Sequence, residues 1–447
     1  MNQADIDTIL ASITPERCTE ITCELVNVPS LTGNERPIAE TCVRLLRDMG
    51  IDAAMQEFEP DRFNCIGRIR GTGGGPTLLF NGHMDISFNG DEQYLPDAPG
   101  YRTKALVKDG FIHGMGVHNM KSGVGAFIAA AEAVKKSGVK LKGDLLLGFV
   151  GGEIERHSVL DYQGPSYRGG GCGTSHWVRN GGIADMAVVG EPTSMGLIHE
   201  HVGSVAVRIT TLGKPAPLRV ASHGDDAIRK MRVLIDVFDD FSADYSARHG
   251  YKGRQSSVHM HSIEGGWPFR CNRVPFFCHV FLEFRVLPSQ RVGDIPQEVD
   301  RLIAMVHAIN PSIEFQTEFF VTLPPALASG NATIADHVRA AHQRVVGAPP
   351  QEGVGMFLSD AGHLQLYGIP CVNYGPSGRT ATGKENWDPD IGEHCSIEDL
   401  TRTARVYAGV ALEVCSKSRA ELGLPVLKAP LPESPLAACR HGGHAHG

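Results

Sequence analysis

The amino-acid sequence predicts an α/β protein in which a mostly parallel sheet forms a larger domain and a ferredoxin-like α+β domain is inserted into it. The first observation is that continuously apolar runs, typical of buried strands, alternate with helical patterns. The second is that residues 199–315 follow a different order of strands and helices, which is complete in itself. The chain has 447 residues, enough for two domains with separate cores.

Four apolar runs predict the strands of the larger domain. They read GPTLLFNGHMD (75–85), GDLLLGFVGGEIE (143–155), IADMAVVGEPTS (183–194) and GIPCVNYGPSG (368–378). Between the first two, a helix is expected to begin at Asn119 and to place its apolar residues at helical spacing. Those apolar residues are Val124, Phe127, Ile128, Ala131 and Val134.

The inserted domain is predicted from the middle of the chain. Strands are expected over 202–213, 256–266, 276–288 and 312–322, and helices over 225–247 and 292–310. The resulting order, βαββαβ, is typical of a split βαβ sandwich. The expected domains are therefore 1–198 and 316–430 for the two parts of the larger domain, 199–315 for the insertion, and 431–447 for a disordered His-rich tail.

Charge and cysteine content exclude several classes of protein. Lys and Arg number 42 and Asp and Glu 50, which gives a net charge of −8, and no basic stripe suits nucleic acid. No apolar run approaches the roughly 18 residues of a membrane span, and no signal peptide is evident. The 11 Cys include no CxxC pair. We expect reduced thiols and a cytoplasmic protein that binds neither nucleic acid nor membrane.

Side chains that suit a metal site follow the predicted strands. The first strand ends in His83 and Asp85, the second in Glu153 and the third in Glu191. Ligands bind at the carboxyl ends of strands in open α/β sheets, so these side chains should converge. Together with the amide of Asn119 they are the groups of a hydrolytic metal site with a carboxylate base. Asp85 is expected to orient the imidazole of His83.

Several motifs of the chain resemble those of one family of metallopeptidases. They are VNVPSLTGNE (26–35), NGHMDIS (81–87), GMGVHNMKSGVGAF (114–127), VVGEPTS (188–194) and GGWPFRCNRVP (265–275). The family is that of the aminoacylases, succinyl-diaminopimelate desuccinylases and glutamate carboxypeptidases. The resemblance covers nearly the whole chain and implies a two-domain hydrolase whose inserted domain is a lid and dimerisation surface. It implies at least a homodimer that acts on a small, carboxylate-bearing substrate.

The resemblance also implies roles for individual residues. His83 matches the metal-binding histidine, Glu153 the general base, and Glu191 a carboxylate ligand of the first metal. Asn272 and Arg285 match lid residues that hold the substrate carboxylate and the developing oxyanion. The planar guanidinium of Arg285 suits a carboxylate because it can donate two parallel hydrogen bonds.

The chain departs from the family pattern at the second metal. The family holds two ions bridged by an aspartate, and Asn119 occupies that position here. A glutamate ligand of the second ion is replaced by Ile154, and the C-terminal histidine falls on Pro389 or Asp388. All three changes affect one metal, whereas the ligands of the other metal and the base are retained. We therefore predict a mononuclear site with one divalent transition metal, Mn, Zn or Co.

Because of these departures, the sequence does not decide which residues complete the set of metal ligands. Asn119 or its neighbour His118 completes the mononuclear site, or Glu155 and Asp388 serve as substitute ligands for a second metal. The lid histidine of the family is missing from its expected place. His223 is the available substitute, either at the site of a partner subunit or as an ordinary turn residue.

The predicted chemistry is hydrolysis of a C–N bond by hydroxide generated at one metal ion, with Glu153 as the base. A single metal favours an activated substrate, so we expect an aminohydrolase (deaminase) of an aromatic amine such as 5-nitroanthranilate. A conventional N-acyl-amino-acid deacylase or dipeptidase and a non-catalytic binding protein are the alternatives. A cysteine nucleophile is disfavoured because only Cys172 has a suggestive context. The Gly-rich loop over 159–181 either lines a pocket for a planar substrate or packs as a surface loop.

Overall fold

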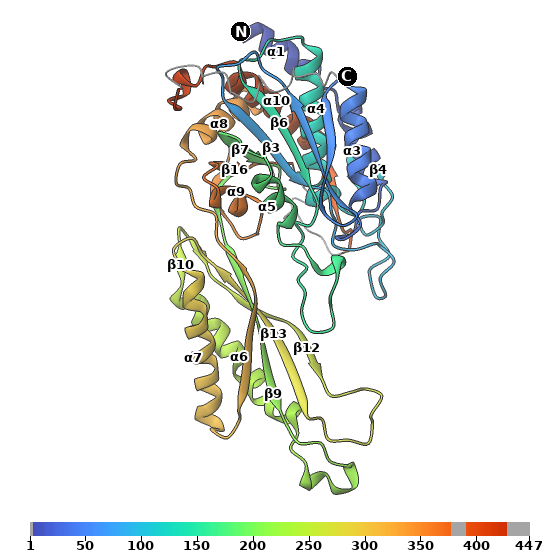
Figure 1. Ribbon diagram of the computed structural model, residues 1–447, viewed down its shortest axis with the longest axis vertical. Helices are drawn as coiled ribbons and strands as arrows, with labels where there is room; N and C mark the ends of the chain where they lie inside the picture. The colour runs from blue at the N-terminus through green and yellow to red at the C-terminus, as the bar shows by residue number, and fades with distance from the viewer. Residues whose placement is uncertain (1–2, 377–389, 427–447) are drawn as a thin grey trace, which may run out of the picture.

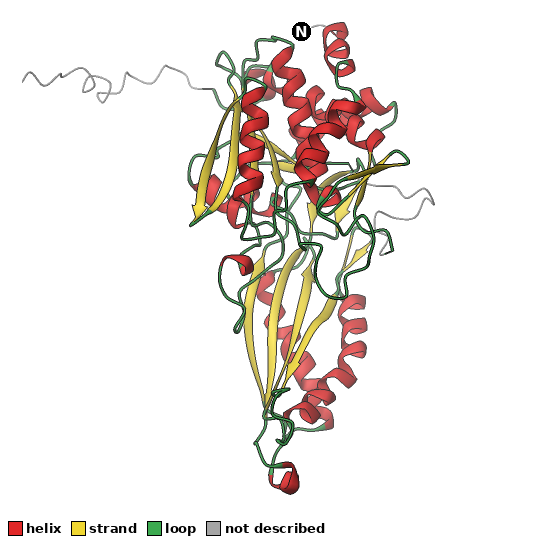
Figure 2. Ribbon diagram, turned by 90° about the vertical axis from the view of Figure 1, so that its right-hand side faces the viewer, coloured by secondary structure: helices red, strands yellow, loops and turns green. Residues whose placement is uncertain are grey.

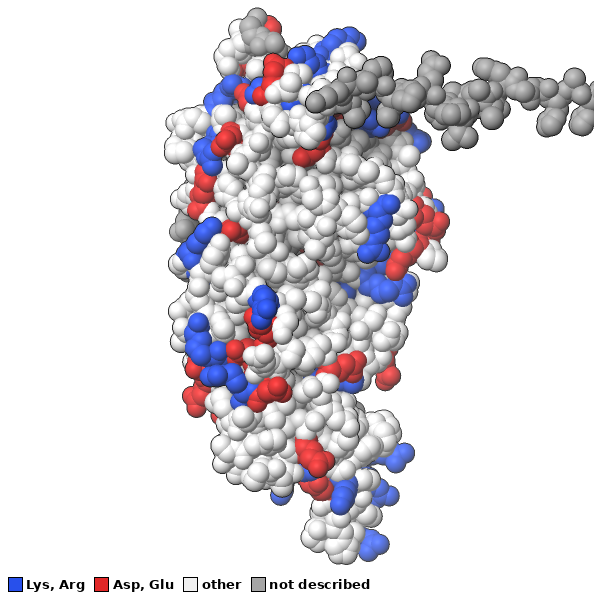
Figure 3. Space-filling view, turned by 60° about the vertical axis from the view of Figure 1, so that its left-hand side comes forward, with Lys and Arg blue, Asp and Glu red and all other residues white. Residues whose placement is uncertain are grey.

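The computed structural model describes residues 3–376 and 390–426, which form a larger α/β domain and a narrower domain extending from it (Figure 1). The predicted His-rich tail (431–447) and Asp388 lie outside the described residues. Within the described ranges, no helix is long and apolar enough to span a membrane. Basic and acidic side chains are interspersed on the face drawn in Figure 3.

The larger domain is built on an eight-stranded sheet in the order β1-β2-β6-β3-β7-β16-β8-β15. Its strands are β1 (Asp52–Glu59), β2 (Arg62–Ile69), β3 (Thr77–His83), β6 (Asp144–Val150), β7 (Met186–Val189), β8 (Leu197–His201), β15 (Glu352–Gly355) and β16 (Cys371–Asn373). The central strands β6, β3, β7 and β16 are parallel, whereas β1 and β2 are antiparallel to their neighbours. The predicted fold class is confirmed.

Helices cover both faces of this sheet, which explains the continuously apolar strands. Leu78 and Phe80 of β3 pack into one core, and Leu79 between them packs into a second core on the opposite face. The first core is covered by α1 (Gln3–Ala11), α2 (Pro15–Val26), α3 (Arg36–Asp48), α4 (Ser122–Lys136), α8 (Ala332–Val346) and α10 (Ile397–Cys415). The second is covered by α5 (Cys172–Arg179) and α9 (Ala361–Leu366).

The helix after β3 begins later than predicted. A short π turn, Val117–Lys121, precedes α4, and Asn119 has the non-helical angles φ −119° and ψ 97°. The carboxylate of Glu393 accepts the backbone N–H groups of His118 and Asn119, at 3.0 and 3.1 Å, and so holds this turn. The predicted helix start at Asn119 is therefore wrong, because α4 begins at Ser122.

The narrower domain has the predicted order of elements. They are β9 (Gly203–Leu212), α6 (Ala227–Arg248), β12 (Val258–Gly265), β13 (Phe277–Val286), α7 (Ile295–Ile309) and β14 (Phe315–Leu323). The four strands form an antiparallel sheet in the order β12-β13-β9-β14. Apolar residues such as Val207 and Leu282 pack this sheet on α6 and α7. Figure 2 shows the helices against the sheet of this domain. The sheet extends to Leu323, past the expected domain boundary at residue 315.

Small elements complete the described chain. A three-stranded sheet joins β17 (His394–Ser396), β5 (Phe111–His113) and β4 (Leu106–Lys108), and a hairpin joins β10 (Gly250–Tyr251) and β11 (Arg254–Gln255). The 3-10 turns are η2 (Pro165–Tyr167), η3 (Leu218–His223), η4 (Val292–Asp294) and η5 (Ala420–Leu422). The cysteines of the described residues form no disulfide.

Candidate active site

Three of the predicted site residues meet at the carboxyl ends of neighbouring strands. His83 is the last residue of β3, Glu153 follows β6, and Glu191 follows β7. Because β6, β3 and β7 are adjacent in the sheet, their ends lie side by side. The ligand atoms of these residues all lie within 4.8 Å of one another, and the side chains are buried. We call these three residues the metal cluster.

The ring of His83 presents one nitrogen to a group of acceptors. Its Nδ1 lies 3.0 Å from the main-chain oxygen of Asp85, so Nδ1 carries a proton. Its Nε2 lies 3.1 Å from Oδ1 of Asn119 and 3.6 Å from a carboxylate oxygen of Glu153. In the neutral ring, the lone pair of Nε2 therefore faces oxygen acceptors. A cation among these atoms would satisfy all of them.

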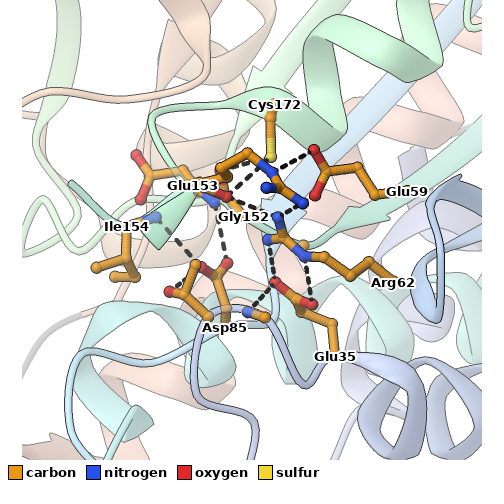
Figure 4. Close-up of polar contacts among 12 residues, drawn as sticks. Glu35, Glu59, Arg62, Asp85, Gly152, Glu153, Ile154 and Cys172 are labelled. Carbon is orange, nitrogen blue, oxygen red and sulfur yellow. Dashed lines mark hydrogen bonds and ion pairs between the residues drawn. The ribbon is translucent and has the colours of Figure 1, made fainter. Parts of the chain in front are cut away.

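The carboxylate of Asp85 holds the turn that carries Glu153. Its Oδ1 accepts the backbone N–H of Glu153 at 3.1 Å, and its Oδ2 accepts that of Ile154 at 3.3 Å (Figure 4). The hydroxyl of Thr32 donates to the same Oδ2 at 2.8 Å. The carboxylate lies 3.7 Å from Nδ1 of His83, which is farther than the main-chain oxygen. The main chain of Asp85 thus orients the imidazole, and its side chain positions the Glu153 segment.

A buried ion pair lies beside the turn that leads into Glu153. Nε of Arg62 donates to the carboxylate of Glu35 at 2.9 Å, and both side chains are fully buried. Nη1 of Arg62 donates to Glu59 at 2.8 Å and to the main-chain oxygen of Arg168 at 2.7 Å. A Cβ at Gly152 would lie 2.6 Å from Nη2 of Arg62, so this glycine permits the close approach in Figure 4.

The buried carboxylates of the metal cluster have raised pKa values. Burial, and then the charges of Glu191 and Asp360, raise the pKa of Glu153 well above its usual value. Burial raises the pKa of Glu191 to about 8, although the imidazole of His83 opposes this shift. Oε1 of Glu191 has no hydrogen-bond partner among the described residues. Repelling carboxylates and an orphaned oxygen fit a divalent cation held by His83 and Glu191, with Asn119 beside it.

Of the other residues considered as ligands, those that the structure describes do not belong to the metal cluster. The ring of His118 lies near His394, and burial lowers the pKa of His118 to about 4. Ile154 is buried, Glu155 is exposed, and Asp388 lies outside the described residues. Within the described ranges, the metal cluster is the one group of three or more His, Cys, Asp or Glu side chains at metal-binding distance.

The lid residues singled out in the sequence lie at opposite ends of the narrower domain. Arg285 lies at the end of β13 next to the larger domain, with Nη2 3.2 Å from Glu283. Its Nη1 is buried and has no hydrogen-bond partner in the described part of the chain. Asn272 is exposed in the loop before β13, and His223 is exposed at the end of η3. Because the 10 residues of β13 span roughly 30 Å, Asn272 does not meet the metal cluster of its own chain.

The Gly-rich loop (159–181) of the larger domain contacts the narrower domain. The hydroxyl of Tyr162 donates to Oε1 of Glu264 on β12, at 3.0 Å. Gly171 lines a cavity next to the metal cluster. The thiol of Cys172 lies 3.5 Å from the main-chain oxygen of Gly152, and burial raises the pKa of Cys172 to about 12. Such a pKa disfavours a nucleophilic thiolate.

Two residues beside the metal cluster were missed in the sequence. Asp360 precedes α9 and His201 ends β8, and both are buried in the lining of the cavity that Glu153 borders. A polar residue before an apolar helix reads as a helix cap, which hides Asp360 in the sequence. Its side chain in fact makes no capping hydrogen bond. His201 gave no signal, because one histidine in a short strand is usually structural.

Comparison with known proteins assigns the chain to a family. Residues 79–413 match the peptidase family M20/M25/M40. The chain belongs to the M20 family. M20 proteins are metal-dependent hydrolases, and the metal cluster is a group of side chains in this chain that could hold such an ion. The family resemblance inferred from the motifs is confirmed.

M20 relatives match most of the chain at low identity. A succinyl-diaminopimelate desuccinylase of Gluconacetobacter diazotrophicus is 25% identical over 403 residues, which cover 86% of this chain and 94% of that enzyme. An N-formyl-4-amino-5-aminomethyl-2-methylpyrimidine deformylase of Bacillus subtilis is 22% identical over 407 residues, 84% of this chain and 88% of that enzyme. The structure of human carnosine dipeptidase 1 superposes with a TM-score of 0.70 at 14% identity, over 92% of this chain and 99% of that one.

Proposed function

We propose that this M20 protein is a mononuclear hydrolase that cleaves a C–N bond in a small, carboxylate-bearing molecule. The observation that carries the proposal is the asymmetry of the site. The positions expected to bind a second ion hold Asn119 and Ile154, while the metal cluster keeps its ligand atoms within 4.8 Å. Isoleucine offers no ligand atom, and a neutral amide compensates two bridged cations poorly. His83 and Glu191, with Asn119, would hold one Mn, Zn or Co ion.

The residues around the proposed ion have separate roles in hydrolysis. A divalent ion there supplies a Lewis acid that lowers the pKa of water. Glu153 accepts a proton from the attacking water, a role that its buried carboxylate, 3.6 Å from Nε2 of His83, supports. The same proton then passes from Glu153 to the departing nitrogen as the C–N bond breaks. Arg285, with a buried Nη1 that lacks a partner among the described residues, is the candidate for binding the substrate carboxylate.

Within this class we favour an aminohydrolase that replaces the amino group of an activated aromatic amine, such as 5-nitroanthranilate, by a hydroxyl group. A site with one metal offers less stabilisation of the transition state, so an electron-poor substrate suits it. Part of the lining of the small cavity beside Glu153 is apolar. That apolar part consists of Leu323, Pro324 and Leu358.

A conventional deacylase or dipeptidase is the second candidate. It is supported by the names of the relatives, which include a desuccinylase, a deformylase and a dipeptidase. Both candidate reactions break a C–N bond, but they release different nitrogen compounds. An aminohydrolase releases ammonia from an arylamine, whereas a deacylase or dipeptidase releases an amine or amino acid from an amide.

The products of a substrate screen decide between the two. Full-length protein is supplied with Mn²⁺ or Zn²⁺ and with carboxylate-bearing arylamines, N-acyl amino acids and dipeptides. Ammonia from an arylamine would support the aminohydrolase, and amino-acid release would replace it by the deacylase. Metal analysis with substrate present should give about one ion per chain, and about two would contradict the mononuclear site.

A single substitution separates an enzyme from a binding protein on the same scaffold. Glu153→Gln preserves the size of the side chain but removes the base. Turnover should fall by about 10²-fold or more while substrate binding is retained. If turnover were unchanged, Glu153 would not be the base.

The proposed assembly is at least a homodimer formed through the narrower domain. Asn272 and His223 are exposed at the end of that domain far from the metal cluster, so a role at a substrate requires the site of a partner subunit. Light scattering of the purified protein tests this point. A monomer at micromolar concentration would contradict both the dimer and these two roles.

A further inference from the structure

A small cavity lies beside the metal cluster on the side of the narrower domain. Gly171 of the Gly-rich loop and Leu323 at the end of β14 form part of its wall, so both domains contribute to it. The polar lining consists of Glu153, Glu155, His201, Ser359, Asp360 and His363. The lining includes no Lys or Arg. The cavity is therefore rich in groups that accept hydrogen bonds.

His201 directs a lone pair into this cavity. Its Nδ1 lies 2.8 Å from the main-chain oxygen of Val202, so Nδ1 carries the ring proton. Nε2 is therefore an acceptor, and it is buried with no hydrogen-bond partner among the described residues. The side chain is only 1% exposed, and Phe357 stacks on the ring at 6.1 Å between centroids. An acceptor held rigidly without a donor is costly unless a water molecule or a ligand supplies the donor.

Asp360 contributes two further acceptors. The residue is 1% exposed, and neither carboxylate oxygen has a hydrogen-bond partner in the described chain. The hydroxyl of Thr174 is close enough to interact with this carboxylate. Gly171, with φ +81°, forms the adjacent wall, and a Cβ there would lie 3.0 Å from Oδ1 of Asp360. The absence of a side chain at Gly171 leaves room next to this carboxylate.

The neighbouring hydroxyl supplies no donor to the cavity. Ser359 donates its hydroxyl proton to Oδ1 of Asn373 at 2.8 Å, so toward the cavity it can only accept. Nδ1 of His363 is engaged with the hydroxyl of Ser175 at 2.9 Å. The acceptors do not form a further metal site, because the described residues contain one group of three ligands at metal-binding distance and it is the metal cluster. A group with several N–H donors on one atom matches this lining.

We infer that this cavity binds the amino group of the substrate, as a primary amine or as ammonium, through Nε2 of His201 and the carboxylate of Asp360. An amine or ammonium nitrogen can donate to both residues at once. The inferred role rests on the proposed function, because the amine is the nitrogen that C–N hydrolysis releases. Glu153 borders the same cavity, so the group that carries the proton lies next to the nitrogen that receives it.

Two cations of equal charge test this inference without turnover. Methylammonium has three N–H donors and tetramethylammonium has none. Calorimetric titration of the full-length, Mn²⁺-loaded protein should show methylammonium binding at least about fivefold tighter than tetramethylammonium. Asp360→Asn and His201→Leu should each reduce this preference to within about twofold, because each removes an acceptor that the donors require.

A remote substitution controls for charge. Glu40→Gln removes one negative charge from an exposed position on α3 and should leave the preference unchanged. Equal affinity for the two cations, or a preference that survives both Asp360→Asn and His201→Leu, would overturn the inference. Circular dichroism checks that each variant is folded. If only one of the two variants folds, that variant alone tests the inference.

The amine site and the aminohydrolase activity can fail separately. If the preference for methylammonium is present but no arylamine yields ammonia, the aminohydrolase proposal fails while the amine site stands. If an arylamine yields ammonia but the two cations bind equally, the amine site is overturned and the aminohydrolase proposal stands.

Discussion

The carboxylate of Asp85 accepts a hydrogen bond from the backbone N–H of Glu153 at 3.1 Å, although the two residues belong to different strand ends. The main-chain oxygen of Asp85 lies 3.0 Å from Nδ1 of His83. One residue therefore fixes the ring of His83, the proposed metal ligand, through its main chain and Glu153, the proposed base, through its side chain. The two functions can be separated, because a substitution changes only the side chain.

Asp85→Asn should reduce kcat more than metal affinity. The amide places an NH₂ group against the backbone donors of Glu153 and Ile154, while the main-chain contact with His83 persists. We expect kcat to fall about 10–100-fold, with a smaller change in the dissociation constant of Mn²⁺. Steady-state kinetics and metal titration measure the two quantities. Thr32→Val, which removes only one donor to Asp85, serves as the milder control. A loss confined to metal affinity would assign the carboxylate to His83 instead.

Arg62→Met should destabilise the protein strongly, because it leaves the carboxylate of Glu35 buried without its cation. Removing one partner of a buried ion pair typically costs about 3–5 kcal/mol of the free energy of unfolding. The double variant Arg62→Met/Glu35→Gln should recover part of this loss. Urea unfolding of the two variants and of Glu35→Gln completes a double-mutant cycle. A loss below about 1 kcal/mol for Arg62→Met would show that the pair contributes little.

The metal cluster could be predicted from the sequence because its residues end apolar strands. Parallel strands bring their carboxyl ends together whatever the loops do, so His83, Glu153 and Glu191 converge as a consequence of topology. The Arg62–Glu35 pair could not be predicted, since charged residues read as surface positions in a sequence. Nor did the sequence reveal strands β1 and β2, because they lack the apolar continuity of the central strands. Arg62 is the first residue of β2.

The turn around Asn119 shows a second limit of sequence reasoning. Its residues fit a helical pattern, but the carboxylate of Glu393, distant in the chain, binds two backbone N–H groups and holds a different geometry. Asp360 was missed for a related reason, because a residue that looks like a helix cap faces a cavity instead. Local propensity predicts local structure and gives no information on partners contributed by distant segments.

Asn119→Asp/Ile154→Glu should raise the metal content. The two substitutions add carboxylates at the positions that lack them, next to the metal cluster. We expect the wild-type protein to hold about one ion per chain and the double variant to approach two. Inductively coupled plasma spectrometry after gel filtration measures the ratio. Asn119→Ala, which adds no ligand, is the matched control and should not exceed the wild-type content. Two ions in the wild type would remove the basis of the mononuclear proposal.

Removal of the metal should make stability depend on pH in a direction set by Glu191. Burial raises the pKa of Glu191 to about 8 from an ordinary value of 4.5. Between these values the folded chain holds a proton that the unfolded chain has released, so the free energy of unfolding of the metal-free protein should fall as pH rises from about 4.5 to 8. The slope for one proton is about 1.4 kcal/mol per pH unit.

Metal binding should reverse this trend, because a cation replaces the proton on Glu191. Addition of Mn²⁺ should therefore raise the melting temperature more at pH 8 than at pH 6, because a smaller fraction of Glu191 is protonated at the higher pH and has to release its proton. Differential scanning fluorimetry with and without Mn²⁺ at several pH values measures both effects. Glu191→Gln cannot titrate, so it should flatten the metal-free pH profile and lose the Mn²⁺ response. A wild-type metal-free protein whose stability rises steadily over pH 5–8 would contradict a buried, protonated Glu191.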